Sequence, residues 1–129
     1  MDVTAALVQH LLASPSVTSK VGQQVFGESI PVGAEAPLVL VRSVIRIPFT
    51  RPTTVWWKHT IAVDCHSTDP GESHDISEAV EKAVDEWNGV DPTGVIANSQ
   101  VENTSLFEDG SFTPTRYRNV VTVAVTARD

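Results

Sequence analysis

The stretch Val55–Trp87 reads VWWKHTIAVDCHSTDPGESHDISEAVEKAVDEW and contains the clearest change of periodicity in the chain. Its first part, Val55–His66, alternates between two faces in the manner of a β-strand. From Asp69 onward, apolar residues instead recur every three or four positions, which is typical of an amphipathic helix. We therefore expect a strand that leads directly into a helix, with both packed against one core. The face expected to point into that core consists of Val55, Trp57, His59, Ile61, Val63 and Cys65.

The sequence also marks where this helix begins and ends. Asp69 can accept hydrogen bonds from the free amides of the first turn, and Pro70 has the backbone angle that a first helical residue needs. Glu72 lies three residues after the cap, as in a capping box. Gly89 suits the left-handed residue that ends many helices. The apolar stripe between them is Ile76, Ala79, Val80, Ala83, Val84 and Trp87.

A second strand is expected upstream, because Leu38–Ile47 is almost entirely branched or apolar. Pro48 and Pro52 cannot take part in the interior of a sheet, so we place a hairpin tip at about Pro48–Thr54. The two strands on either side of this tip then form a long antiparallel hairpin.

The ends of the chain complete the expected fold. Asp2–Ala13 has the apolar spacing of a helix, with Asp2 as its cap. A short second helical turn is expected to start at Ser14-Pro15 and to end at Gly22. Val25-Phe26 is a candidate for a short strand. Downstream, Gly94–Phe107 is expected to be extended, Glu108–Ser111 to turn, and Arg116–Ala127 to form the last strand. The fold class is therefore α+β: a mainly antiparallel sheet of two hairpins, with an N-terminal helix and an amphipathic helix packed on it.

Composition narrows the class of protein. The chain has 129 residues, which is the size of a single domain, and a formal net charge of −7. Its single cysteine excludes an internal disulfide framework. We expect no signal peptide and no membrane span, and the acidity argues against tight binding to exposed nucleic acid.

One cluster of residues could indicate an enzyme or a metal site. Asp64, His66, Asp69 and His74 are residue types that bind zinc, but their spacing matches no established metal motif. Asp69 is better explained as a helix cap, and Asp64 and His66 as solvent-facing residues near a strand end. Cys65 falls on the core face, where a free cysteine is usually a small apolar filler. We therefore predict no catalytic residue, no metal and no cofactor.

The tryptophans divide between core and surface. Trp57 and Trp87 lie on apolar stripes, and we expect both in the core. Trp56 points the other way, so it is either a partly covered edge residue or an interface anchor.

The charges are separated along the chain. Leu38–Val63 carries four basic residues and no acidic one, whereas Asp64–Asp91 carries nine acidic residues against Lys82 alone. Ordinary surface variation is one interpretation. The other is a pair of complementary patches, which favours head-to-tail assembly over two-fold pairing.

Four segments in this order resemble a known family. They are the pattern LLASPSVTSKVGQQVF in which the N-terminal helix ends, the strand PLVLVRSV, the strand-to-helix stretch from Trp56 to Trp87, and the final FEDGSFTPTRYRNVVTVAVTARD. Together they are similar to the small tail-terminator, or tail-completion, proteins of long-tailed bacteriophages. The resemblance spans nearly the whole chain but includes no catalytic motif. Small head-closure and neck proteins of the same viruses are the nearest alternative.

The resemblance implies a structural role in the virion. Family members form a ring, commonly of six subunits, that caps the tail tube, ends its growth and offers a surface for joining the head connector. Genomic DNA passes through the pore, and no enzyme activity is implied. The protein would be made in the host cytoplasm and would lie at the head-proximal end of the tail. A small metal-dependent enzyme and a binding module without a viral role are the competing hypotheses.

The charge pattern and the exposed aromatics suggest where the subunits meet. We expect Ile47–Trp56 to order on contact with another chain, although a rigid tip folded onto its own sheet is the alternative. If the tip is not a docking element, the contacts should come from Gly27–Pro37 or Glu108–Thr115. The residues predicted at the subunit or tube interface are Arg42, Arg46, Phe49, Arg51, Trp56, Lys58, Glu78, Glu81 and Asp85.

Overall fold

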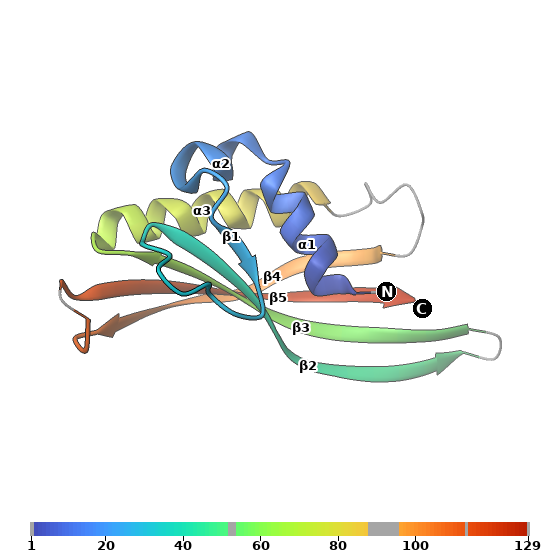
Figure 1. Ribbon diagram of the computed structural model, residues 1–129. Coiled ribbons are helices and arrows are strands. Elements are labelled where there is room, and N and C mark those ends of the chain that lie inside the picture. The colour runs from blue at the N-terminus through green and yellow to red at the C-terminus, as the bar shows by residue number, and fades with distance from the viewer. Residues whose placement is uncertain (1, 52–53, 88–95, 113, 129) are drawn as a thin grey trace.

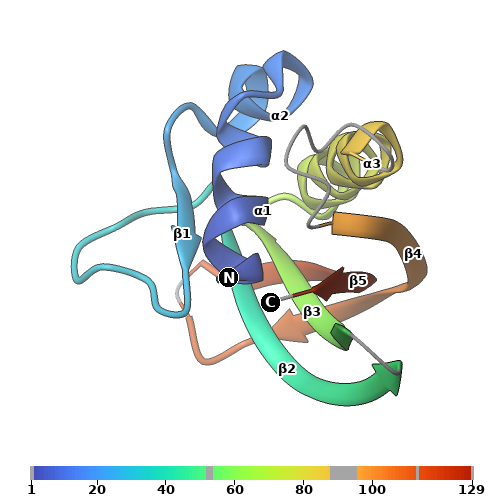
Figure 2. The same cartoon turned by 90° about the vertical axis from the view of Figure 1, so that its right-hand side faces the viewer.

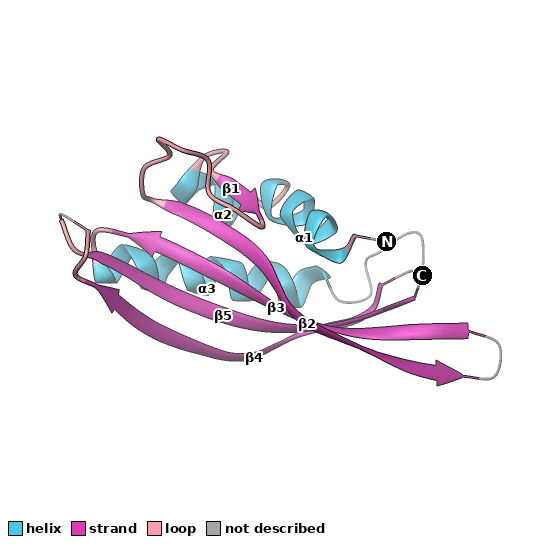
Figure 3. Ribbon diagram, turned by 60° about the horizontal axis from the view of Figure 1, so that its bottom comes forward, coloured by secondary structure: helices cyan, strands magenta, loops and turns pink. Residues whose placement is uncertain are grey.

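The computed structural model describes residues 2–51, 54–87, 96–112 and 114–128. Its helices lie together on one face of a twisted sheet, and the other face of the sheet has no helix over it (Figures 1 and 3). The elements in chain order are α1 (Val3–Leu12), α2 (Pro15–Val21), β1 (Val25–Gly27), β2 (Leu38–Arg51), β3 (Thr54–Ser67), α3 (Pro70–Trp87), β4 (Ile96–Asp109) and β5 (Arg116–Arg128). The expected α+β class and the order helix, hairpin, helix, hairpin are confirmed.

The helix ends follow the local chemistry of the sequence. Asp2 accepts a bond from the amide of Ala5 at 3.0 Å, and Asp69 accepts one from Gly71 at the same distance. Gly22 ends α2 with a positive φ of 62°. The expected stop at Gly89 lies outside the described residues. None of the described helices is both long and apolar enough to span a membrane.

The five strands are arranged in the order β1-β2-β3-β5-β4. The pairs β2–β3, β3–β5 and β5–β4 are antiparallel, and β1 adds a short parallel pair to β2. Figure 2, a view along the strands, shows the strong twist of the sheet. The stub at Val25-Phe26 is therefore a strand, but its parallel pairing was not expected.

The β2–β3 hairpin is longer than predicted, since β2 continues through Pro48 to Arg51. Pro48 is tolerated because β1 pairs only with residues 39–41 of β2, which leaves the distal part of β2 as a sheet edge among the described residues. The expectation of a tip that begins at Pro48 was wrong. This distal part of β2 and β3 extends past the helices (Figure 1).

An extra residue in β2 changes which side chains face the core. Ser43 pairs with Ile61 and Ile45 pairs with Thr60, so Val44 is a β-bulge. After the bulge, Ile45 and Ile47 lie on the face away from the helices, and Arg46 is opposite His59 on the helix-covered face.

The main core lies between the helices and the sheet. The whole predicted stripe of α3 is buried, and Trp87 is only 6% exposed. Polar side chains also tie α3 to the sheet: Ser73 donates to the carbonyl of Cys65 at 2.7 Å and accepts from the side-chain amide of Asn119 at 2.9 Å. These bonds fix the angle and register at which α3 crosses β3 and β5.

Candidate interaction surfaces

The distal β2–β3 hairpin, which we call the arm (residues 44–51 and 54–60), exposes apolar side chains at its free edge. Val44, Ile45 and Ile47 are 55%, 52% and 53% exposed. Lys58, opposite Ile47, is also exposed. An edge strand with apolar side chains and unpaired backbone groups is a common template for contact with another chain. The sequence did not reveal these residues, because their exposure depends on the bulge at Val44.

The aromatic residues of the arm are less buried than predicted. Trp57 is half-buried, not part of the core, and the guanidinium of Arg46 lies 4.2 Å from its ring centroid. Trp56 is half-buried on the opposite face, which fits a partly covered residue as well as an interface anchor. The arm therefore has one cation–π pair on the helix side and an apolar row on the other side.

Two predicted interface residues, Phe49 and Arg51, are in β2 opposite Trp56 and Thr54. Their side chains lie outside the described residues, so their part in an interface stays a prediction.

The acidic residues of α3 form a largely solvent-facing stripe, though some of its charges have local partners. Glu78 is 3.0 Å from His74, and Glu81 accepts a hydrogen bond from the hydroxyl of Thr104. Lys82 lies 3.9 Å from Glu86. Asp85 is exposed. Because exposed pairs of this kind contribute little to stability, these carboxylates can still serve a partner.

Arg42 has an internal role that the sequence did not indicate. Its Nε donates to Asp64 at 2.9 Å, and Arg118 lies 3.7 Å from the same carboxylate. Asp64 is 1% exposed, so the expectation that it faces solvent was wrong. A buried carboxylate needs such partners, because an unpaired charge in the interior lowers the free energy of unfolding by roughly several kcal/mol. Arg42 remains 40% exposed and could also contact a neighbour.

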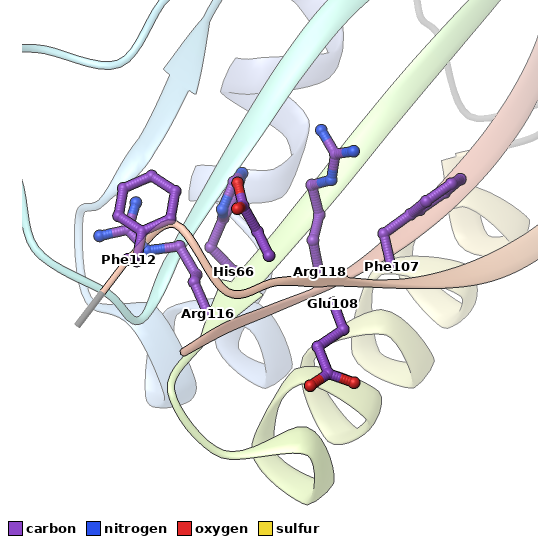
Figure 4. Close-up of a pocket in the computed structure, with 7 residues that line it drawn as sticks. His66, Phe107, Glu108, Phe112, Arg116 and Arg118 are labelled. Carbon is purple, nitrogen blue, oxygen red and sulfur yellow. The ribbon is translucent and has the colours of Figure 1, made fainter. Parts of the chain in front are cut away.

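His66 is likewise buried, at 8% exposure, where the sequence indicated a solvent-facing residue. It lines a cavity of about 200 Å³ at the end of the sheet opposite the tip of the arm. The other lining residues are Phe107, Glu108, Asp109, Phe112, Arg116 and Arg118. Figure 4 shows His66 between the two arginines, with Glu108 pointing away. Burial lowers the pKa of His66 to about 4, so the ring is neutral at pH 7.

The residues considered for metal binding have separate surroundings. Asp64 is bound by arginine, Asp69 caps α3, and His74 is exposed beside Glu78. Within residues 2–51, 54–87, 96–112 and 114–128, no three His, Cys, Asp or Glu side chains are grouped to hold a metal ion. Cys65 is completely buried, and this burial raises the pKa of its thiol, as fits an unreactive core residue.

A family model described as "Tail completion protein gp17" matches residues 5–126, nearly the whole chain. The chain belongs to this tail completion family. It is therefore a structural protein of a phage tail and a virion component, and the resemblance found in the sequence is confirmed.

A solved structure supports the fold. A chain from the structure titled "Virion of native gene transfer agent (GTA) particle" superposes with a TM-score of 0.74 and 16% sequence identity. The match covers 98% of this tail completion protein and 95% of that chain. No curated protein sequence matches the chain.

Proposed function

We propose that this tail completion protein forms a ring, of six copies, that caps the finished tail tube, ends its polymerisation and presents a surface to the head–tail connector. In this role it lies at the head-proximal end of the tail after synthesis in the host cytoplasm. The role requires no catalytic step.

The observation that carries the proposal is the separation of two unlike surfaces. The arm has exposed Arg46 on its open edge strand β2 and exposed Lys58 on the adjoining strand β3, and α3 has an exposed acidic stripe that includes Glu78 and Asp85. When the arm of one subunit contacts α3 of the next, the contact is head-to-tail, and a head-to-tail contact that closes forms a ring. Two-fold pairing of like surfaces, arm on arm or α3 on α3, would bring like charges together instead.

The apolar row of the arm adds buried apolar area to an interface that charges alone would hold weakly. Val44, Ile45 and Ile47 gain little from the isolated subunit, but in a ring they can be buried against a neighbour or the tube protein. The net charge of −7 suits a pore through which genomic DNA moves without specific binding.

The proposal is tested by adding the purified protein to tube protein that is polymerising. Electron microscopy should show rings alone and rings at tube ends, and the mean tube length should fall as more ring protein is added. Bovine serum albumin at equal mass serves as the control for crowding. Unchanged tube lengths together with binding to the head connector alone would favour a head-closure role.

A further inference from the structure

The cavity beside His66 is built from the ends of three strands. His66 comes from β3, Phe107 and Asp109 from β4, and Arg116 and Arg118 from β5. In the register of the sheet, Arg118 is opposite both His66 and Phe107, and Arg116 is opposite Asp109. These side chains therefore lie on one face of the sheet, away from the helices (Figure 4).

Each of the two arginines makes a cation–π contact with a phenylalanine ring. The guanidinium of Arg116 lies 4.1 Å from the ring centroid of Phe112, and that of Arg118 lies 5.0 Å from that of Phe107. Phe107 and Phe112 are nevertheless 48% and 42% exposed. The cavity thus has cationic groups with exposed apolar walls, a combination that attracts an anion attached to an apolar group.

Hydrogen-bonding groups inside the cavity are unused. Neither ring nitrogen of His66 has a hydrogen-bond partner among the described residues, nor does Nε of Arg116. Buried polar atoms in native proteins nearly always have partners, because an unmade hydrogen bond in the interior is destabilising. One N–H of neutral His66 and the Nε–H of Arg116 are therefore two buried donors without an acceptor among the described residues, which a ligand group that reaches them would satisfy.

The acidic residues nearby are engaged elsewhere. Asp109 accepts hydrogen bonds from the amide and the hydroxyl of Ser111, at 3.0 and 2.6 Å, and these bonds lower the pKa of Asp109. Asp64 accepts from Arg42 and also lies 3.7 Å from Arg118, so it partly compensates the charge of one of the two cavity arginines. Glu108 points away from the cavity (Figure 4). Arg116 has no carboxylate within ion-pair distance among the described residues, so its charge is not compensated by a direct contact.

We propose that this cavity binds a carboxylate group, next to an apolar side chain, on a partner protein of the virion. The carboxylate accepts from Arg116 and His66, and the apolar neighbour packs on Phe107 or Phe112. The site rests on the proposed function only in placing the partner in the virion. At about 200 Å³ the cavity is smaller than pockets for drug-sized molecules, roughly 300–1,000 Å³, and suits a single side chain or chain end.

A protein carboxylate fits better than a nucleic-acid phosphate. Binding to a phosphate backbone depends on several Lys and Arg contacts along an open surface, whereas this site is a single concave cavity on a chain of net charge −7. The phenylalanine walls are also suited to an aliphatic or aromatic neighbour.

The test uses N-acetyl-phenylalanine as the probe and N-acetyl-phenylalaninamide as its uncharged match. NMR titration of the isolated full chain should show saturable shifts of the His66 ring and Arg116 Nε–H signals with the acid. The amide should bind about tenfold more weakly or worse, as expected when a charged acceptor is lost. Equal binding of acid and amide, or no saturable shift, would overturn the proposal. Inorganic phosphate binding more tightly than the acid would instead indicate a nucleic-acid phosphate site and would also overturn it.

Substitutions at the cavity test whether the acid binds there. Arg116→Gln and His66→Gln should each weaken binding of the acid about tenfold. Arg46→Gln is the matched control, because Arg46 also stacks on an aromatic ring but lies on the arm, and it should leave binding unchanged. Thermal unfolding checks that each variant folds. If either cavity variant does not fold, the comparison of acid with amide on the unaltered protein still decides the question.

Occupation in the particle is tested by arginine-selective modification with phenylglyoxal and mass spectrometry. Arg116 should react more slowly in assembled tails than in the isolated protein. Equal reaction rates would contradict the claim that a virion protein occupies the cavity. The NMR experiment needs neither ring nor tube. Failure to cap tubes with the probe still bound would therefore refute the proposed function alone, whereas capping without binding would refute the site alone.

Discussion

Trp87 is one of the side chains through which α3 packs against α1. Its ring stacks on His10 at a centroid distance of 5.4 Å, and Nε2 of His10 donates to the carbonyl of Ala83 at 2.7 Å. Replacing Trp87 with alanine should lower the free energy of unfolding by about 3–5 kcal/mol, because it removes both burial and this stacking. Urea denaturation measures the change.

The matched control for Trp87 is Trp56→Ala, which removes the same side chain from a half-buried position. It should cost less than half as much. A loss below about 1 kcal/mol for Trp87→Ala would contradict the close packing of α3 on α1.

His66 makes stability depend on pH. Its pKa is about 4 in the folded protein because burial disfavours the charged ring, against 6.5 for an unperturbed histidine. The unfolded chain therefore binds more protons between these values, and the free energy of unfolding should fall as the pH drops from 6.5 towards 4. Well above 6.5 the ring is neutral in both states and contributes no pH dependence.

The difference in unfolding free energy between the unaltered protein and His66→Phe separates this effect from the titration of the other ionisable groups. Urea denaturation at several pH values should give a shallower decline for the variant across that window. Parallel curves would mean that His66 is not held neutral by the fold.

At the scale of elements, the arm differs from the rest of the sheet in having one free edge. The other strand of the hairpin, β3, is covered by β5 as far as Trp56, whereas distal β2 has no second neighbour among the described residues. We expect the amides of residues 44–49 to exchange faster in the isolated protein than those of β5, and to become protected in rings or capped tubes. Hydrogen exchange with mass spectrometry measures both states.

A substitution separates docking from folding in the arm. Ile47→Lys removes an exposed apolar side chain, 53% exposed, and should change the unfolding free energy by no more than about 0.5 kcal/mol. It should nevertheless reduce ring formation. Equal protection of the arm in isolated and assembled protein would assign the contacts to other segments, such as the turn beside the cavity.

At the scale of the whole molecule, the arm and α3 present opposite charges on separate surfaces. Reversing Arg46 and Lys58 to Glu should dissociate the ring, and raising the salt concentration should weaken the unaltered ring, since the Debye length is about 8 Å at physiological ionic strength. Mass photometry at low and high salt follows the assembly.

Lys20→Glu serves as the control, because Lys20 is exposed on α2, away from the arm. It should leave the ring intact. Combining the arm reversal with Glu78→Lys and Asp85→Lys should restore assembly if these surfaces pair. An oligomer that is unaffected by the arm reversal would exclude the charge-paired interface.

Features that depend on neighbours in the chain could be predicted from the sequence alone. The cap at Asp69, the stripe ending at Trp87 and the core face of β3 from His59 to Cys65 are confirmed. Their physical causes are local: hydrogen bonds within one turn, and the helical and strand periods. The family could also be recognised, since the order of these elements spans nearly the whole chain.

Features that depend on contacts between distant segments were decided by the tertiary structure. The bulge at Val44 moves Ile45 and Ile47 to the open face, because one extra residue reverses the alternation of a strand. His66 was expected in solvent, but its burial depends on Arg116 and Arg118, which reach it only because β5 lies beside β3. No local pattern encodes that adjacency, so the cavity at the strand ends is a product of sheet order and register.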